Sequence, residues 1–500
     1  MQTEIYFHRE GTEIQVAYIE DDKLMEFFVE EPSTLSILGN IYKAKVVDVL
    51  PGMNAAFVDI GLMKNAFLFI NDVLHLYTDT YIEHSEEITT ADDNNPPMPD
   101  TPVPMIDDYI KRNEEILVQV SKDVKGGKNV RVSMKITIPG KYLVYLPTLK
   151  HIGISHRITD EKIREDILGF VTEHTPAGAG FIIRTRACEP PKEYLLEEMQ
   201  ELIRRWEVIK EKSCHGSAPQ LIHTDIGIVG KTLRDLVDDN VVCIRVDDRS
   251  LYNDMKDMLI KEWPERAACI ECMADGKSSF EDKNIDAQLH RALNRKVSLK
   301  NGGYIVVDQT EALTTIDVNT GSFIGVSNPE ETAFETNIEA AITSIQQIRL
   351  RNLSGMIIID FIDMKEPVHR NKIIECIQDG IKKDRVRMNL VQMSELGLIE
   401  LTRKRIRKPL QSYYLEECPT CRGQGVVPST KLLRSDILKK LKKEYKQNWK
   451  KITLQLHPRV AEALRNDDSF FDAITYQYGL KMEIESIMDV SVDTIKILPE

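Results

Sequence analysis

The sequence predicts an α/β protein built from several domains. Its 500 residues are enough for a large hydrophobic core and, by length, for roughly three or four domains. Short β-rich runs separated by Pro51-Gly52 and by Gly61 indicate a small five-stranded barrel near the start. Further along, two apolar β-type runs flank a long amphipathic segment, which is typical of a strand–helix–strand crossover. These two patterns together give the α/β class.

The beginning of the chain predicts β-structure and no membrane segment. Residues 1–37 alternate apolar and polar positions, which indicates one or two β-hairpins. No apolar run approaches the ~20 residues that are needed to span a bilayer. The first ten residues lack a basic segment followed by an apolar one, so we expect no export signal. The eight cysteines are scattered apart from two Cys-x-x-Cys pairs, which favours metal-bound thiolates in a reducing cytoplasm over a disulfide framework.

The charge is distributed unevenly, although the net value is −14. Residues 72–108 contain ten Asp or Glu and no Lys or Arg, and their Pro-rich middle predicts a solvated, disordered loop. Because its negative charge would repel a nucleic acid, we expect the loop to point away from one. Residues 401–451 contain fifteen Lys or Arg against four acids. Their densest cluster could contact phosphate or could be an ordinary solvated face. This cluster consists of Arg403, Lys404, Arg405, Arg407 and Lys408.

Aromatic residues fall on adjacent predicted strands of the barrel. Phe57 and Phe67 occupy these strands, and Lys128 lies in a basic turn flanked by glycines. Barrels of this type bind single-stranded nucleic acid by stacking bases on exposed aromatics, each worth ~1–3 kcal/mol. The alternative is that both phenylalanines belong to the hydrophobic core.

From Lys135 onward the pattern is mixed α/β. Phe181–Ala187 predicts a strand that ends in Arg184 and Thr185, and a guanidinium beside a hydroxyl can grip a terminal phosphate. By pattern alone this Arg-Thr pair is commonplace. Residues 225–232 resemble a phosphate-binding P-loop, but Asp225 stands where that pattern requires glycine, so we expect no nucleotide there.

Acidic residues follow the two apolar runs between 301 and 364. Asp317 and Asn319 lie two apart, so on a strand they point to one face. Asp360 ends the run Met356–Ile359, which is apolar enough to predict a strand covered on both faces. Between the runs, residues 328–331 read as a capped helix start, and the crossover can bring the carboxylates together.

Two carboxylates beside an amide oxygen form a hard, oxygen-only site that suits Mg²⁺. The sequence therefore favours a magnesium centre made by Asp317 and Asp360. In the alternative interpretation, the two acids only cap helices or pair with Arg349 or Arg351.

The second Cys-x-x-Cys motif is the better zinc candidate. Cys418 and Cys421 are followed by glycines that allow a tight turn and point both thiolates at one ion. Structural Zn²⁺ takes four ligands, so the missing pair comes either from Cys269 and Cys272 or from the same motif in a second copy. Cys269 and Cys272 lie in a helix-like stretch, where chance placement is the simpler interpretation. After Gly425 the sequence predicts a basic amphipathic helix and then a small α/β domain.

These motifs, in this order, resemble the ribonuclease E/G family from about residue 10 to about residue 430. The stretches GNIYKAKV, PGMNAAFVDIG and AFL are similar to its S1-type RNA-binding domain. The stretches EALTTIDVNTGSF and IIIDFIDM are similar to its catalytic motifs, with RLRNLSG between them, and ECPTCRGQG is similar to its zinc-link. The chain lacks the long scaffold tail of ribonuclease E, which places it nearer the ribonuclease G type. Arg186 and the residues after it depart from the family pattern.

The resemblance implies a particular domain architecture. It comprises an RNase H-like subdomain (1–37 and 229–292) in which an S1-type OB barrel (38–134, with the acidic insertion 72–108) is inserted, a 5′-sensor domain (135–228), a DNase I-like α/β catalytic domain (293–414), a zinc-link (415–428) and a small C-terminal α/β domain (429–500).

The resemblance also implies a function. It predicts a cytoplasmic, Mg²⁺-dependent endoribonuclease that cuts single-stranded RNA to 5′-phosphate and 3′-hydroxyl ends in rRNA processing and mRNA decay. Asp317 and Asp360 would hold the metal, and Asn319 would orient a carboxylate or contact the scissile phosphate. One zinc shared between two chains would form a homodimer, and dimers could pair into tetramers. A pocket for the 5′-monophosphate would be formed by Gly140, Val144, Arg184 and Thr185.

Two other functions are open at this point. One is a non-catalytic RNA-binding scaffold, which the intact Asp317, Asn319 and Asp360 disfavour. The other is a metal phosphoesterase that acts on small molecules, which would leave the barrel and the basic segment without a role.

Overall fold

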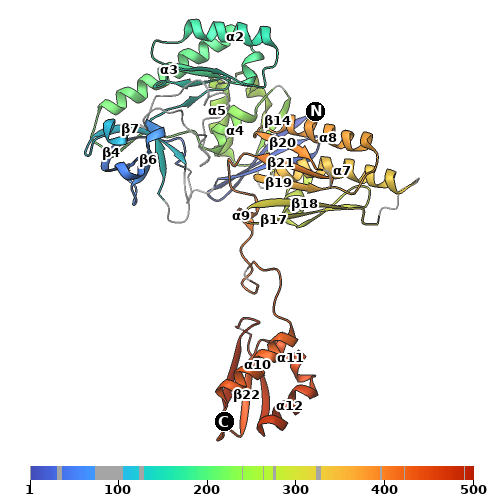
Figure 1. Cartoon of the computed structure of the whole chain (residues 1–500). Coiled ribbons are helices and arrows are strands. Elements are labelled where there is room, and N and C mark those ends of the chain that lie inside the picture. The colour runs from blue at the N-terminus through green and yellow to red at the C-terminus, as the bar shows by residue number, and fades with distance from the viewer. Residues whose placement is uncertain are drawn as a thin grey trace. The chain divides into compact units, whose positions relative to one another are not determined.

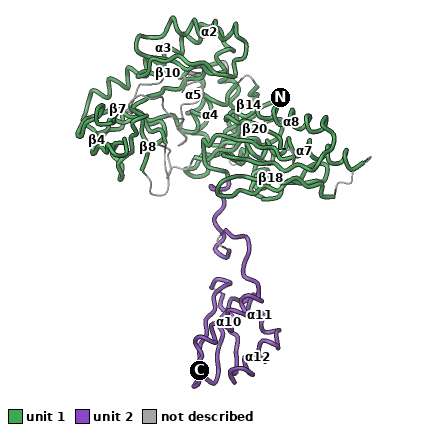
Figure 2. Tube along the Cα trace, in the orientation of Figure 1, with its two compact units in different colours: residues 1–410 green, residues 411–500 purple. Residues whose placement is uncertain are grey.

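The computed structural model contains two compact units, Met1–Leu410 and Gln411–Glu500 (Figure 2). Within the described ranges, every helix is too short or too polar to cross a bilayer. The residues that the structure describes are 2–30, 37–73, 105–122, 129–238, 240–262, 264–273, 278–322, 328–394, 397–421, 423–488 and 490–500.

The first sheet combines strands from two distant parts of the chain. Three consecutive antiparallel strands form the predicted hairpins, and the first of them also pairs in parallel with a strand that follows the barrel. The strand order is β15-β14-β1-β2-β3. The strands are β1 (Thr3–Glu10), β2 (Glu13–Glu20), β3 (Lys23–Glu30), β14 (Val241–Val246) and β15 (Ile270–Cys272). Helices α4 (Ile228–Leu236) and α5 (Arg249–Glu262) share one hydrophobic cluster with this sheet, and α6 (Ile285–Leu293) shares another. The RNase H-like label for it stays a prediction.

A closed barrel of five strands lies between β3 and β14 in the sequence, as predicted. Its strands run in the order β4-β5-β6-β8-β7, and β7 closes the ring by pairing with β4. The strands are β4 (Ile41–Leu50), β5 (Ala55–Asp59), β6 (Ala66–Phe69), β7 (Glu115–Lys122) and β8 (Arg131–Ser133). Short helices η2 (Pro51–Met53), α1 (Ile70–Val73) and η4 (Ile106–Asp108) link them, and β13 (Gln220–His223) adds to β4. Most of the acidic insertion, residues 74–104, lies outside the described residues.

A four-stranded sheet with two helices follows the barrel (Figure 1). Its order is β11-β12-β10-β9, and its core includes Tyr145, Phe181, Leu195 and Met199. The elements are β9 (Ile138–Pro139), β10 (Leu143–Leu146), β11 (Ile152–Ile154), β12 (Gly180–Ile183), α2 (Glu161–His174), η5 (Thr185–Cys188) and α3 (Lys192–Cys214).

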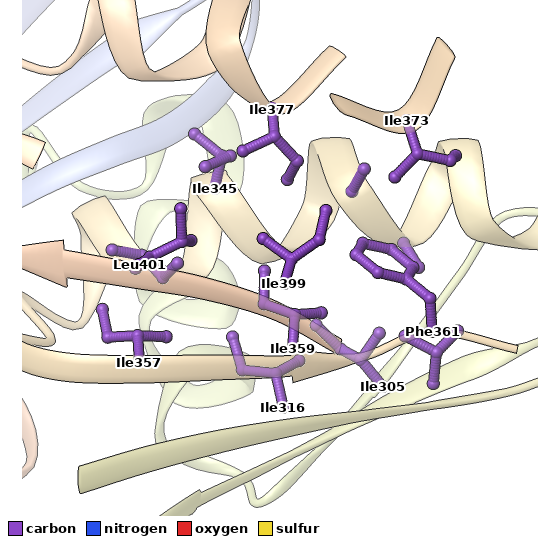
Figure 3. Packing of buried hydrophobic residues seen from close by; sticks show 14 of the residues in the cluster. Ile305, Ile316, Ile345, Ile357, Ile359, Phe361, Ile373, Ile377, Ile399 and Leu401 are labelled. Atoms are coloured by element: carbon purple, nitrogen blue, oxygen red, sulfur yellow. The ribbon is translucent and has the colours of Figure 1, made fainter. Parts of the chain in front are cut away.

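The last sheet of this unit carries the acidic motifs. It has the order β16-β17-β18-β19-β21-β20, and β18 and β19 are parallel neighbours joined by the predicted crossover helix. Its elements are β16 (Lys296–Ser298), β17 (Tyr304–Gln309), β18 (Leu313–Asn319), α7 (Pro329–Leu350), β19 (Gly355–Asp360), α8 (Pro367–Lys383), β20 (Met388–Met393) and β21 (Leu398–Arg403). Figure 3 shows the strand isoleucines directed at Ile345 of α7 and at Ile373 and Ile377 of α8.

Among the described residues, α7 and α8 cover one face of this sheet and the other face is exposed at Met356, so the prediction that Met356–Ile359 is buried on both sides is wrong. Ile357 and Ile359 are fully buried beneath α7 and α8, whereas Met356 is 51% exposed on the other face. The physical reason is the mixed topology. Strand β19 has a parallel neighbour in β18 and an antiparallel one in β21, and such a sheet can leave one face in water.

The second unit, residues 411–500, is also α/β. A three-stranded sheet in the order β23-β22-β24 packs with its helices around Ile437, Leu454 and Phe470. The predicted basic helix ends at Glu444, and α12 was not predicted. The elements are α9 (Gln411–Tyr414), α10 (Thr430–Glu444), β22 (Lys451–Leu456), α11 (Pro458–Arg465), α12 (Asp468–Tyr478), β23 (Lys481–Ser486) and β24 (Ile495–Pro499).

Candidate active site

Two aspartates lie side by side at the ends of neighbouring strands. Asp317 on β18 and Asp360 on β19 are direct register partners, and both side chains are exposed on the open face of the sheet. The Asn319 amide Nδ2 donates a 2.7 Å hydrogen bond to Asp317 Oδ2. The structure therefore brings the three predicted catalytic residues together. It also corrects their setting, because the carboxylates stand on an open surface rather than at buried strand ends.

The crossover helix α7 fixes this arrangement. Asn328 caps its N-terminus by accepting a 2.8 Å hydrogen bond from the Glu331 amide, with Pro329 at the first helical position, as predicted. Further along, Asn337 is buried and its side chain both donates to and accepts from the backbone of Ile362, at 2.7 and 3.0 Å. Glu330 accepts from the amides of residues 365 and 366. The chain beyond Asp360 is therefore held by α7.

The electrostatics of the pair favour a cation. Burial and then the neighbouring charges of Asp317 and Asp363 raise the pKa of Asp360 above its ordinary value. Among the described residues, no Lys or Arg lies within ion-pair distance of Asp317 or Asp360. Like charges without a cationic partner, with only oxygen donors, are the donor set that Mg²⁺ prefers. The residues therefore fit a magnesium ion.

The alternative of pairing with nearby arginines is wrong. Arg349 is buried and binds Glu20 and Glu26, at 2.7 and 3.0 Å. Arg351 donates from Nε to Gln347 Oε1 and from Nη2 to the Asn294 carbonyl, each at 2.8 Å. The guanidinium groups of both arginines are therefore bound to partners other than Asp317 and Asp360.

The barrel carries an aromatic group on its outer surface. Phe57 and Phe67 are cross-strand partners with ring centroids 5.3 Å apart, and both are half-buried while their strand neighbours are fully buried. Phe69 lies 4.4 Å from Phe67, and the Arg131 guanidinium lies 4.6 Å from the Phe69 ring. The interpretation as pure core residues is therefore wrong. Phe69 was missed, although the Phe-x-Phe alternation along β6 is the signal for it. Lys128 lies outside the described residues.

The predicted phosphate-binding residues gather where β12 ends. Arg184 Nη1 donates to the Gly140 carbonyl at 2.8 Å, and the exposed Thr185 shares a 2.8 Å hydrogen bond with Ser155. Val144 is on β10, which pairs with β12. Sequence reasoning missed two acids here, Asp235 and Glu198. Asp235 contacts Arg184 at 3.0 Å, and Glu198 accepts from the turn that follows Gly140.

The two thiols of the second unit lie in a tight, glycine-rich turn. Gly423 and Gly425 adopt positive φ angles of 79° and 72°, and the Gly425 amide donates to Cys421 Sγ at 3.4 Å. Hydrogen bonds from the backbone of Cys421 and Thr420 lower the pKa of Cys418, which favours the thiolate. Two thiolates supply half of a tetrahedral zinc site. The expected helical setting of the other pair is confirmed for Cys269, which ends the 3-10 helix η6 (Pro264–Cys269), and is wrong for Cys272, which ends the strand β15.

The P-loop-like stretch and part of the basic cluster have structural roles. The Glu30 carboxylate accepts from the Ile228 amide at 3.0 Å at the start of α4, and Lys231 pairs with Asp225 at 2.9 Å, so both phosphate-binding groups are already used. Arg403 is buried against Asp384, at 2.7 Å. Arg407 lies over the Phe28 ring, 3.9 Å from its centroid. Phosphate contact by Arg403 is therefore excluded.

Comparison with known proteins identifies the family. The profile of the "Ribonuclease E/G family" matches residues 137–406. Ribonuclease G of Salmonella typhimurium is 36% identical over 470 residues, which cover 94% of each chain. Ribonuclease G of Haemophilus influenzae is 35% identical and covers 95% of this chain and 92% of its own. Ribonuclease E of the same organism is 31% identical over 91% of this chain but only 47% of its own. The chain therefore belongs to the ribonuclease E/G family.

Proposed function

We propose that this protein is a Mg²⁺-dependent endoribonuclease that cuts single-stranded RNA in RNA processing and decay, in the cytoplasm. The endoribonuclease activity follows from the family, whose curated relatives are named Ribonuclease G and Ribonuclease E. The observation that carries the metal-dependent mechanism is the pairing of Asp317 with Asp360 in register on an open sheet face.

The chain's own residues would perform separate tasks at this centre. Asp317 and Asp360 would hold Mg²⁺, which supplies water activation and charge stabilisation at the phosphate when bound. Asn319 holds Asp317 through its 2.7 Å hydrogen bond and so fixes the direction of that carboxylate. Both carboxylates are exposed on the open face, where a single strand would bind. Attack of water on phosphorus with cleavage of the P–O3′ bond would leave a 5′-phosphate and a 3′-hydroxyl.

Substrate binding would be divided between two further surfaces. Bases would stack on Phe57 and Phe67, which lie on the outer face of the barrel. A 5′-monophosphate would bind at Arg184 and Thr185, which favours monophosphorylated RNA. Zn²⁺ held by Cys418 and Cys421 of two chains would join them into a homodimer, which could pair further into a tetramer.

The test replaces each carboxylate with its neutral isostere. Asp317→Asn and Asp360→Asn should each lower kcat on the order of 100-fold or more, because a metal ligand is lost, while RNA affinity measured in EDTA stays near that of the wild type. Cleavage of end-labelled RNA with Mg²⁺ or with EDTA gives kcat, and analysis of the product ends gives the bond that breaks.

Asp308→Asn is the matched control. Asp308 lies on the same face two strands from Asp360, but its carboxylate is paired with Arg295. Its replacement should leave kcat unchanged. Normal turnover in both Asp317→Asn and Asp360→Asn would discard the assignment, and RNA binding without any cleavage by the wild type would indicate a scaffold.

A further inference from the structure

The guanidinium of Arg184 is held by one of its nitrogens only. Nη1 donates to the Gly140 carbonyl at 2.8 Å and to Asp235 Oδ1 at 3.0 Å, which uses both of its hydrogens. In the part of the chain that the structure describes, no acceptor lies on Nε or Nη2 of Arg184. The side chain is 24% exposed. The Nε–Nη2 edge is therefore available, and this edge is the one that grips a phosphate with two parallel hydrogen bonds.

Asp235 on α4 is a fixed anion behind Arg184. Its carboxylate also accepts from Arg234, at 2.9 Å from Nε and 2.8 Å from Nη2. Burial alone would raise its pKa, but the hydrogen bonds and charges of Arg234 and Arg184 outweigh burial and lower the pKa to about 2. Asp235 is therefore ionised at any neutral pH, and Arg234 prevents its carboxylate from turning away from Arg184.

Glu198 on α3 holds the turn that carries the Gly140 carbonyl, the other acceptor of Arg184. Its half-buried carboxylate accepts from the amides of the three residues after Gly140, at 2.6, 2.9 and 2.8 Å. A Cβ at position 140 would lie 2.7 Å from Glu198 Oε1, so a larger residue there would displace the Glu198 carboxylate. Glu198 thus uses the amides that would otherwise attract an anion. The turn keeps the Gly140 carbonyl on Arg184, and the three amides after Gly140 are not free to bind a phosphate.

We propose that Asp235 and Glu198 are positioning residues that present the Nε–Nη2 edge of Arg184 as a two-donor fork to the terminal phosphate monoester of an RNA 5′ end. They set the preference for 5′-monophosphorylated over 5′-hydroxyl RNA. This inference rests on the proposed function, since it concerns the same pocket. Without Asp235 the Arg184 guanidinium loses one of its two hydrogen-bond acceptors, and its Nε–Nη2 edge can rotate away from the phosphate.

The experiment compares one oligoribonucleotide with a 5′-monophosphate or a 5′-hydroxyl. Its affinity is measured by fluorescence anisotropy in EDTA, and its cleavage is measured as kcat and KM in Mg²⁺. Asp235→Ala should reduce the affinity ratio between the two substrates about tenfold, with the loss falling on the monophosphorylated one. Asp235→Asn, which keeps an oxygen acceptor, should lose less. Glu198→Gln should also lower the ratio. The effect should fall on Kd and KM rather than on kcat.

Glu189→Ala is the matched control. Glu189 is an exposed acid that lies 3.8 Å from Arg186 beside the pocket, but it does not contact Arg184. Its removal changes the local charge equally and should leave the ratio unchanged. An equal effect of Glu189→Ala, or a full preference retained by both Asp235→Asn and Glu198→Gln, would overturn the proposal.

Cleavage and binding by the wild type distinguish a failure of the nuclease function from a failure of the 5′-phosphate pocket. A wild type that cuts no RNA but binds monophosphorylated RNA more tightly overturns the nuclease function alone. A wild type that cuts RNA but does not distinguish the two 5′ ends overturns the pocket and this inference with it.

Discussion

Asn337 holds the backbone beyond Asp360, the second of the two proposed metal ligands. Its amide group makes both possible hydrogen bonds to the backbone of Ile362, two positions after Asp360. The Asn337 side chain is fully buried in α7, so these bonds form where water does not compete. A contact of this kind couples the helix that joins the two strands to the carboxylate that ends the second strand.

Replacement of Asn337 by alanine tests this coupling. We expect a loss of ~1–3 kcal/mol in the free energy of unfolding, because two half-buried backbone groups of Ile362 lose their partner. We also expect kcat to fall on the order of tenfold, since a contact that supports a metal ligand is removed. Denaturant unfolding and RNA cleavage measure the two quantities. Glu335→Ala, on the exposed side of α7, should change neither, and an unchanged kcat in Asn337→Ala would contradict the role.

Single residues differ in how well their position can be predicted from the sequence. Asp317 and Asn319 could be predicted to share a face because a strand repeats every two residues. Asn337 and Asp235 could not. An isolated polar residue in a helical stretch has the same pattern whether it faces solvent or a backbone group far away in the chain. The contacts that position the site come from separate elements, and no local spacing records them.

At the scale of elements, β19 shows where periodicity becomes ambiguous. Its run of three isoleucines masks the alternation, so it is typical of a strand covered on both faces. In the structure the three isoleucines differ in exposure, since Ile357 and Ile359 are fully buried and Ile358 is only half-buried. What decides the exposure is that α7 and α8 pack on the same side of the sheet. The barrel strands were easier to predict from the sequence, because turn-forming Pro and Gly residues separate them.

The contact between β1 and the end of β14 gives a pH dependence. His8 Nδ1 lies 2.6 Å from Asp247 Oδ2, and this hydrogen bond raises the pKa of His8 above its ordinary value despite partial burial. A raised pKa means that the protonated form is stabilised by folding. This stabilisation is complete below about pH 6.5 and is lost as the pH rises through the pKa of the folded state.

The free energy of unfolding should therefore fall by on the order of 1 kcal/mol between pH 6 and the alkaline side of the His8 transition. Denaturant unfolding at several pH values measures it. His8→Gln, which can still hydrogen-bond but does not titrate, should lack this component of the pH dependence. His174→Gln, at the exposed end of α2, is the control and should keep it. The same slope in His8→Gln and the wild type would exclude this pair as the source.

At the scale of the whole molecule, the order of motifs carried more information than any single pattern. The class, the barrel and the catalytic crossover could be predicted, because each has a local signature. The pairing of β1 with β14 has none, because strand partners distant in sequence share no common spacing. The completion of the proposed zinc site could not be predicted for the same reason, since half of its ligands would have to come from elsewhere.

Removal of zinc should dissociate the protein. If Cys418 and Cys421 of two copies share one tetrahedral ion, then chelation, or a Cys418→Ser substitution, should convert dimers to monomers. Light scattering after size-exclusion chromatography gives the mass, and metal analysis should find about one zinc per two chains. Cys269→Ser with Cys272→Ser is the control and should leave the mass unchanged. Dimers that persist without zinc would place the interface elsewhere.

Because β1 pairs in parallel with β14, β1 must wait during synthesis until its partner strand has been made. Thr3 leaves the ribosome long before Val241, its partner in the sheet, and at about 5–20 residues per second the delay is roughly ten to fifty seconds. During that interval β2 protects one edge of β1, while the other edge is open to foreign strands. The barrel, whose strands are contiguous, can close in the meantime. Nascent chains stalled before Val241 should therefore be the form most prone to aggregate and most dependent on chaperones.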